Sequence, residues 1–382
     1  MVSMNKVKFG DVVRLSKARS SDPIADGYER YIGLDHIEPG DLRIRRWGNV
    51  ADGVTFTSVF KPGQVLFGKR RAYQRKVAVA NFAGVCSGDI YVFESKDSKI
   101  LLPELLPFIC QTEAFFQHAV GTSAGSLSPR TNWTSLADFV FALPPMEEQN
   151  KTSAILSLMD DVVESYRVST ECAMLVFESV ANDLFGVSTK RWNIKRIEEI
   201  SHFVTNGFVG KSAEHYVVND GVPYLVSKNV RRNKFKLDDL TFISHEFHKK
   251  AKKSQLQAGD ILTVQSGHIG ETAVVSYDLD GANCHALIIT RPKTELIDPH
   301  FVSYFLNSTV GQRILSRLVI GSTIQHLNTS DLKKLDIPVP PIKEQKEIVS
   351  LLKTMSHDHD ALRQRLNNAI NLRLRLMEEV FK

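Results

Sequence analysis

A repeated double-proline motif divides this 382-residue chain into two similar halves. The motif reads LPPMEEQ at residues 143–149 and VPPIKEQ at residues 339–345, so that 196 residues separate Pro144 from Pro340. Two adjacent prolines cannot lie inside a helix, but they fit its first turn, where a missing N–H costs nothing. The acidic residues that follow lie near the positive end of a helix dipole. We therefore predict that a helix begins after each copy.

Other short segments recur at a similar offset and in the same order. GQVL at 63–66 matches GDIL at 259–262, and LLPELL at 101–106 matches IDPHFV at 297–302, both at an offset of 196. YIGL at 31–34 matches YLVS at 224–227, and GTS at 121–123 matches GST at 321–323. Small changes of offset are what loop insertions produce. The pattern predicts an internal duplication of a globular domain, because the period is too long for a solenoid.

Each predicted domain combines short strands with a packed helix, which indicates an α+β fold. Apolar runs at 12–15, 31–34, 65–67 and 90–93 are bounded by Gly, Asp or Pro and predict strands. Residues 101–118 carry an apolar helical face, and 299–318 repeat it in the second half. The predicted order is a domain at 1–143, a long helix at 144–189, a second domain at 190–339 and a second long helix at 340–382.

The two long helices carry a heptad pattern, which is typical of a coiled coil. One alternative is that each helix packs on its own domain, but five repeats favour an antiparallel pair formed by the two helices. His359 and Arg373 interrupt the second pattern and either set the register or lie under a partner. The positions in the second helix are Ile348, Leu352, Met355, His359, Leu362, Leu366, Ala369, Arg373, Leu376 and Val380. Their equivalents are Thr152, Leu156, Met159, Val163, Tyr166, Thr170, Ala173, Phe177, Val180 and Leu184.

Several catalytic and membrane signatures are missing from the sequence. It contains neither a GxxxxGK[ST] phosphate loop nor a GxGxxG motif. The four cysteines form no CxxC pair, so we expect ordinary thiols and no metal site. No apolar run reaches the roughly 18 residues that span a bilayer, and we expect a cytoplasmic protein. The net charge of +5 is compatible with nucleic-acid binding.

Basic and polar loops occupy equivalent places in the two halves, and we predict that they contact DNA. Arg and Gln side chains can pair with base edges, whereas Lys binds phosphates. The alternative for the basic loop after residue 68 is a solvated hairpin tip. The candidates in the first half are Lys69, Arg70, Arg71, Tyr73, Gln74, Arg75, Lys76, Arg130 and Asn132. Those in the second half are Lys228, Arg231, Arg232, Gln265, Ser266, His268, Gln325 and His326.

The duplicated plan resembles the DNA specificity subunit of type I restriction–modification systems. The resemblance covers essentially the whole chain and is carried by Leu143–Gln149, Val339–Gln345, YIGL at 31–34, and the strand starts at Gly63 and Gly259. It implies two target-recognition domains that each read half of a bipartite, asymmetric DNA site. It also implies that the paired helices act as a spacer and as the docking surface for two methyltransferase subunits. We assign Glu147, Gln149, Glu344 and Gln345 to partner binding on this basis.

The same resemblance implies a chain without an active site of its own. S-adenosylmethionine, ATP and magnesium would belong to the methyltransferase and to the translocase–nuclease subunits, and adenine N6 is the usual methylation target. Three alternatives remain open. They are a self-contained nuclease or methyltransferase, a coiled-coil scaffold without a DNA role, and a specificity subunit that serves a single-polypeptide restriction–methylation enzyme.

Overall fold

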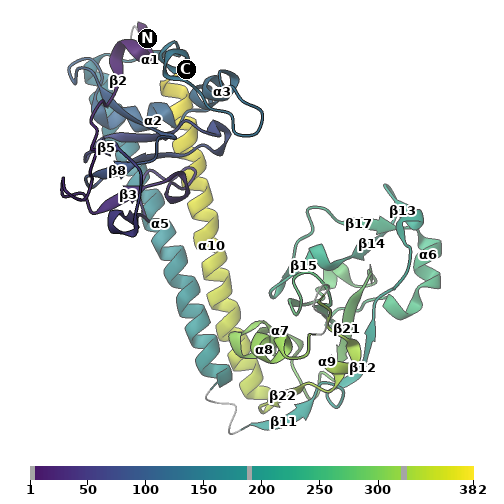
Figure 1. Ribbon diagram of the computed structural model, residues 1–382. Coiled ribbons are helices and arrows are strands. Elements are labelled where there is room, and N and C mark those ends of the chain that lie inside the picture. The colour runs from purple at the N-terminus through teal and green to yellow at the C-terminus, as the bar shows by residue number, and fades with distance from the viewer. Residues whose placement is uncertain (1–4, 187–191, 320–324) are drawn as a thin grey trace. The chain divides into compact units, whose positions relative to one another are not determined.

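The computed structural model describes residues 5–186, 192–319 and 325–382, which form two compact units (Figure 1). Unit 1 comprises Met1–Arg167 and Gln364–Lys382, and unit 2 comprises Val168–Arg363. The long helices α5 (Met146–Gly186) and α10 (Ile342–Val380) each contribute one part to unit 1 and another part to unit 2. Residues 187–189, which the sequence assigns to the first helix, lie outside the described residues.

The described residues of unit 1 form two four-stranded sheets and one strand pair. The first sheet has the order β2-β9-β6-β7 and is antiparallel, and the second has the order β4-β3-β8-β5 with β3 and β8 parallel. The pair β1-β10 joins the two ends of the domain. The strands are β1 (Asn5–Lys8), β2 (Val13–Leu15), β3 (Arg30–Ile32), β4 (Gly48–Asn49), β5 (Ser58–Phe60), β6 (Val65–Gly68), β7 (Val77–Val79), β8 (Gly84–Cys86), β9 (Ile90–Ser95) and β10 (Val140–Leu143). The short helices are α1 (Phe9–Val12), α2 (Leu106–Cys110), α3 (Glu113–Gly121) and α4 (Trp133–Ala137).

Unit 2 repeats this arrangement. Its sheets have the orders β12-β21-β18-β19 and β13-β17-β14-β20, and β11-β22 and β15-β16 form separate pairs. The strands are β11 (Asn193–Arg196), β12 (Ser201–Asn206), β13 (Tyr216–Val217), β14 (Val222–Leu225), β15 (Val230–Arg231), β16 (Lys234–Phe235), β17 (Thr241–Ile243), β18 (Ile261–Val264), β19 (Thr272–Val274), β20 (Asn283–Cys284), β21 (Leu287–Pro292) and β22 (Asp336–Val339). The short helices are α6 (His245–Lys250), α7 (Pro299–Asn307), α8 (Thr309–Ser316) and α9 (Thr329–Lys333).

Strand pairing confirms the predicted duplication and the α+β class. Strands β6 and β18 begin at Val65 and Ile261, which are 196 residues apart, and each lies second from one edge of its sheet. The YIGL match also holds, because Tyr31 starts the parallel pairing of β3 with β8 and Tyr224 starts that of β14 with β20. The two halves therefore share the topology of the first sheet and the parallel strand pair of the second, as well as short motifs.

The single helix predicted at 101–118 is wrong, because the chain breaks it into two. Thr112 has an extended backbone, and its side chain accepts a hydrogen bond from the N–H of Phe115. This bond caps the start of α3. The helix predicted at 299–318 is broken in the same way at the equivalent residue, Ser308, whose side chain accepts from the N–H of Gly311. Ser and Thr favour such caps because their oxygen satisfies an N–H left free in the first turn.

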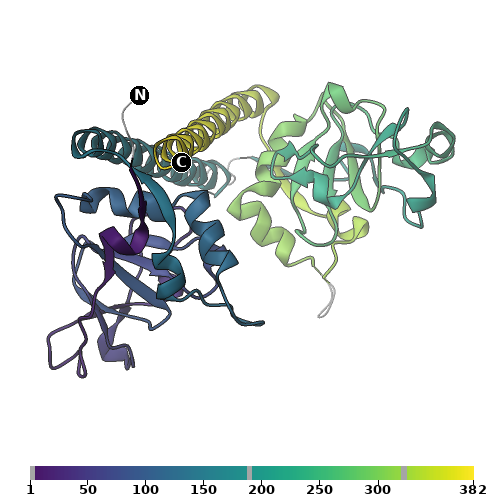
Figure 2. The ribbon, with the colours of Figure 1, turned by 90° about the horizontal axis from the view of Figure 1, so that it is seen from above.

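The long helices form the predicted antiparallel pair. In unit 1, Leu156 near the start of α5 shares a core with Met377 near the end of α10. In unit 2, Phe185 near the end of α5 shares a core with Leu352 near the start of α10. Every predicted heptad position is buried or half-buried. The last part of α10 and the first part of α5 lie along one side of unit 1 (Figure 2).

Aromatic side chains fill the core between the sheets and the helices of each unit. In unit 1 the rings of Phe67 and Phe115 join β6 to α3, with centroids 5.4 Å apart. In unit 2 the ring of Phe185 packs edge-on against Phe301 of α7, with centroids 5.6 Å apart. Leu156 and Met377 of the long helices belong to the same core in unit 1, as Phe185 and Leu352 do in unit 2, so apolar contacts attach the helices to both sheet domains.

Candidate nucleic-acid interface

Two of the predicted DNA-contacting loops of unit 1 meet directly. The N–H of Arg71, after β6, donates to the carbonyl of Pro129 at 2.7 Å, and the N–H of Thr131 donates to the carbonyl of Lys69 at 3.0 Å. Arg70 and Arg130 form a β-bridge at this point. We call this place the loop crossing of unit 1, defined by Lys69, Arg70, Arg71 and Arg130. These loops are far apart in the sequence, and the fold brings them together.

Asp89 holds the two arginines of this crossing in position. Its Oδ2 accepts from Arg70 at 3.1 Å and its Oδ1 accepts from Arg130 at 2.8 Å. Burial alone would raise the pKa of Asp89, but the hydrogen bonds from Arg130 and Arg70 outweigh it and lower that pKa. The side chain of Arg130 remains 51% exposed, so its guanidinium is oriented by one carboxylate and still faces solvent.

The equivalent loops of unit 2 cross in the same way. The N–H of Leu327 donates to the carbonyl of Gln265 at 3.0 Å, which matches the bond between Thr131 and Lys69. The hydroxyl of Ser266 and Nδ1 of His326 lie 2.7 Å apart, where unit 1 has Arg70 and Arg130. We call this the loop crossing of unit 2, defined by Gln265, Ser266 and His326. Equivalent backbone thus presents different hydrogen-bonding side chains in the two units.

The remaining cations of the basic loop in unit 1 have partners inside the unit. Arg75 forms a two-pronged pair with Glu113, and Lys76 donates to the carbonyl of Leu34. Lys69 lies 4.5 Å from the centroid of the Tyr91 ring, and burial lowers its pKa. In contrast, Tyr73 is 53% exposed. Gln74 is half-buried, and Asn132 caps α4 by accepting from the N–H of Ser135 at 2.8 Å.

The other predicted residues of unit 2 do not all gather at its crossing. Nε2 of His268 lies 2.8 Å from both the guanidinium of Arg231 and the carbonyl of Ser227, so this histidine joins two loops. Lys228 and Gln325 are exposed. Arg232 lines a cleft beside α5 and α10 instead. The segment 321–323, which the sequence aligns with 121–123, lies outside the described residues.

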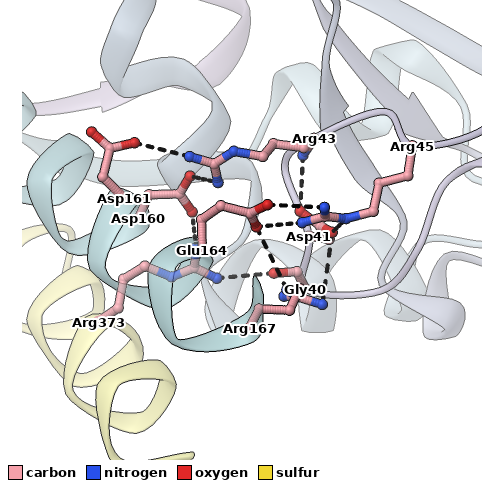
Figure 3. Close-up of polar contacts among 9 residues, drawn as sticks. All are labelled: Gly40, Asp41, Arg43, Arg45, Asp160, Asp161, Glu164, Arg167 and Arg373. Carbon is pink, nitrogen blue, oxygen red and sulfur yellow. Dashed lines mark hydrogen bonds and ion pairs between the residues drawn. The ribbon is translucent and has the colours of Figure 1, made fainter. Parts of the chain in front are cut away.

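A buried ion network, which the sequence did not predict, joins the sheet domain of unit 1 to its helices (Figure 3). Arg373 of α10 is 2% exposed and donates to Asp160 of α5 and, at 2.9 Å, to the carbonyl of Gly40. The one signal in the sequence was that an arginine occupies a heptad position. The other members of the network, around the loop after Gly40, are Asp41, Arg43, Arg45, Asp161, Glu164 and Arg167.

Unit 2 has no copy of this buried pair. The residues equivalent to Asp160 and Arg373 are Ser356 and Phe177, and both line the cleft beside Arg232. His359, the other polar residue in the heptad pattern, is half-buried and lines the same cleft. Lys234 and Asp360 form an ion pair across it at 3.1 Å, with side chains 54% and 46% exposed. Apolar contacts hold both sheet domains to the helices, and unit 1 adds a buried ion pair to them.

A family model described as "Type I restriction modification DNA specificity domain" matches residues 1–167 and 189–372. The chain belongs to this family. Among its relatives, the MjaVIII specificity subunit of Methanocaldococcus jannaschii is 22% identical, over 92% of this chain and 85% of that protein. The EcoBI specificity subunit of Escherichia coli is 23% identical over 70% of this chain, and the match spans 65% of its length.

Solved structures of specificity subunits share the fold. The specificity subunit from M. genitalium superposes with a TM-score of 0.63 at 13% identity, covering 100% of this chain and 96% of the other. A chain from a type I restriction–modification complex superposes with a TM-score of 0.62 at 17% identity, covering 99% and 97%. These likenesses support the arrangement of two sheet domains and two long helices in this specificity-domain protein.

The glutamines of the two double-proline motifs are structural in this specificity-domain protein. Gln149 is 1% exposed, accepts from the N–H of Leu102 and donates to the carbonyls of Ile100 and Pro144. Gln345 is fully buried and makes the three equivalent bonds, to Asp298, Leu296 and Pro340. Their burial contradicts the expectation that they bind a partner, because every polar atom of each amide group is already bonded within its own unit.

The two glutamates predicted to bind partners differ in their surroundings. Glu147 is exposed and pairs with Lys151, one turn further along α5. Glu344 is half-buried, and its carboxylate accepts from the indole N–H of Trp192 at 3.2 Å. Within the described ranges, no cluster of three or more His, Cys, Asp or Glu side chains has the arrangement of a metal site. Across the same ranges, no helix combines the length and apolarity that a membrane span requires.

Proposed function

We propose that this chain is the DNA-recognition subunit of a type I restriction–modification complex and that each unit reads one half of a bipartite, asymmetric site. The two loop crossings carry this proposal. They share a backbone hydrogen bond at equivalent positions, yet one presents Arg70 and Arg130 and the other Ser266 and His326. Arginine pairs favourably with guanine edges, whereas a hydroxyl and an imidazole suit other bases. One scaffold with two sets of side chains fits two different half-sites.

The catalytic subunits would dock on the long helices. Four apolar side chains on these helices are solvent-exposed at equivalent positions: Ile155 and Leu351 at 49% and 47%, and Val176 and Leu372 at 54% and 60%. Exposed apolar side chains that recur along a helix suit an interface with another helix. Because the same positions recur on both helices, the pattern fits two copies of one partner, namely two methyltransferase subunits. Translocase–nuclease subunits would join the larger complex.

Chemistry in this proposal is supplied by the partners. The methyltransferase would bring S-adenosylmethionine and turn the target adenine out of the base stack to methylate N6. ATP and magnesium would belong to the translocase–nuclease subunits. The chain itself would be non-catalytic and would select the site, and the α5–α10 pair would act as the spacer that sets the gap between the half-sites.

The deciding experiment is to co-express the chain with its neighbouring methyltransferase and to map methylated adenines across a genome. The proposal expects one motif made of two short halves with a gap of fixed length. A continuous motif, or methylation that does not depend on this chain, would contradict it. Methylation or cleavage by the purified chain alone would instead support the self-contained enzyme.

A further inference from the structure

A basic groove lies beside the loop crossing of each unit. In unit 1 the groove has a volume of about 730 Å³ and runs between the loop after β2 and helix α4. In unit 2 it has a volume of about 680 Å³ and runs between the loop after β12 and helix α9. Trp133 and Ala137 line the first, and Thr329 and Lys333, their equivalents at an offset of 196, line the second. The two grooves therefore occupy the same place in the fold.

Both grooves carry an excess of positive charge. Arg14, Lys17, Arg19 and Lys96 line the groove of unit 1, whose one carboxylate, Glu94, pairs with Arg14 at 2.8 Å. Lys250, Lys252, Lys253 and Lys333 line the groove of unit 2, which has no carboxylate among its described lining residues. Among the described residues, no ion pair is formed by Lys17, Arg19, Lys252, Lys253 or Lys333.

The charges of the two grooves were not copied by the duplication. Leu15 and Val204 occupy the same place in the two sheets. Leu15 pairs with Phe93, which also pairs with the first residue of β6. Val204 pairs with Thr290, which also pairs with the first residue of β18. Lys17 and Arg19 therefore correspond to Asn206 and Phe208, which are uncharged. The lysines of unit 2 come instead from α6, from the 3₁₀ segment Lys252–Ser254 and from the end of α9, where Lys333 stands at the position of Ala137. The same charge at the same place, built from different positions, indicates a shared ligand.

Hydrogen bonds connect the groove of unit 2 to its loop crossing, and the groove of unit 1 is lined by a residue that follows its crossing closely in the sequence. In unit 2, Asn206 lines the groove and accepts from the side chain of Gln265 at 2.5 Å. Thr329 of the groove donates to the same Asn206 oxygen. In unit 1, Trp133 of the groove lies three residues after Arg130 of the crossing. The pKa of Lys69 at the crossing is lowered first by burial, then by the charge of Arg130, and also by the charge of Arg19 in the groove. A strand whose bases lie at the crossing would carry its phosphates along the groove.

We propose that the two grooves bind the phosphodiester backbone next to each half-site, an inference that rests on the proposed function. Phosphate contacts fix the position of a protein on DNA without reading its sequence. Binding phosphates therefore requires positive charge in each groove. It does not require the same type of residue, or the same sequence position, in the two units. The crossings select the bases, and the grooves supply affinity that does not depend on sequence.

The test measures DNA binding by the full chain assembled with its methyltransferase, using fluorescently labelled duplexes with and without the mapped motif. The groove variants are Lys252→Gln/Lys253→Gln in unit 2 and Lys17→Gln/Arg19→Gln in unit 1. The matched control is Lys236→Gln/Lys249→Gln, which removes two exposed lysines of unit 2 that lie outside the groove. Circular dichroism melting verifies that all variants are folded.

Each groove variant is expected to weaken binding to both duplexes by a similar factor. The slope of log affinity against log salt should become less negative by roughly 0.9 for each phosphate that the variant no longer neutralises, while the methylated motif stays the same. An unchanged slope, a loss confined to the motif duplex, or failed assembly with the methyltransferase would overturn the proposal. The last result would identify the groove as a protein interface. If the wild-type complex does not select its motif, the proposed function fails instead.

Discussion

The guanidinium of Arg373 donates a hydrogen bond to the carboxylate of Asp160, 213 residues earlier in the chain, inside the helix pair of unit 1. Asp160 also accepts from Arg43, which lies in the loop of the sheet domain. One carboxylate therefore joins α5, α10 and the first sheet domain. Burial lowers the pKa of Arg373 from its ordinary value, and the charge of Asp160 opposes that effect.

Replacing Asp160 should strongly destabilise unit 1. Asp160→Ala leaves the buried Arg373 without a carboxylate, and breaking a buried pair in this way costs about 3–5 kcal/mol. Arg373→Met should cost less, because Asp160 keeps Arg43 and the new side chain is apolar. Urea unfolding, followed with a probe in unit 1, measures both losses. Asp161→Ala is the control, because that carboxylate is 73% exposed and should change stability by less than about 1 kcal/mol. Equal losses in all three variants would refute the role of burial.

The two motif glutamines should contribute equally to stability. Gln149→Ala and Gln345→Ala each leave two carbonyls and one N–H without their partner, and each such buried group costs about 1–3 kcal/mol. Because the partners are equivalent, the two variants should lower their own unit's melting temperature by similar amounts. Glu147→Ala, at an exposed pair, should have little effect. A large loss of stability in only one glutamine variant would show that the hydrogen bonds of Gln149 and Gln345 do not contribute equally.

Asp89 should make the stability of unit 1 sensitive to acid. Its pKa is lowered in the folded state, so its stabilising contribution is complete above the unfolded value of about 3.9 and is lost as pH falls through the folded value. Asp89→Asn should therefore reduce stability at neutral pH, and the difference from the wild type should shrink in acid. Denaturant unfolding between about pH 2.5 and pH 7 measures this difference. A difference that is constant with pH would exclude the ionised carboxylate as its source.

Single changes at the two crossings should alter different halves of the recognised site. Arg130→Ala should relax selection at one position of the half read by unit 1, and His326→Ala should do so in the half read by unit 2. A good side-chain–base pair is worth about 1–3 kcal/mol of discrimination. Methylation mapping with each variant complex reports both halves at once. If each unit reads one half of the site, the half read by the unmutated unit should stay the same. A change in both halves from either variant would contradict this proposal.

Shortening both long helices should shorten the gap in the recognised site. Deleting one heptad from the middle of each helix removes about 10 Å of rise, which corresponds to roughly three base pairs. Methylation mapping would then find the same two halves with a smaller gap. Deleting a heptad from α10 alone is the control, since it breaks the pairing register. A double-deletion complex that retains the original gap would refute the spacer role.

The duplication and its local signals were readable in the sequence, whereas most long-range partners were not. Proline chemistry placed the helix starts, and heptad spacing predicted the antiparallel pair. Thr112 and Ser308 carried a capping signal that an apolar helical pattern concealed. Asp89 lies between the two crossing loops, so no spacing rule links it to Arg70 and Arg130. The burial of Gln149 was not predicted, because one of its acceptors, the carbonyl of Ile100, lies 49 residues earlier in the sequence.

The hydrogen bond between Arg373 and the loop at Gly40 constrains which first domains can be exchanged by recombination. Arg373 donates to the carbonyl of Gly40, so the loop and the arginine that holds it are 333 residues apart in the sequence. Exchanging residues 1–143 with a relative would place a foreign loop against the resident arginine, and the hybrid would fold well only if that loop placed a carbonyl at the same position. The second domain is held to the helices through the core that Phe185 and Leu352 share with Phe301, and through the bonds that Gln345 makes to Asp298 and Leu296, so a foreign second domain would have to match those contacts instead.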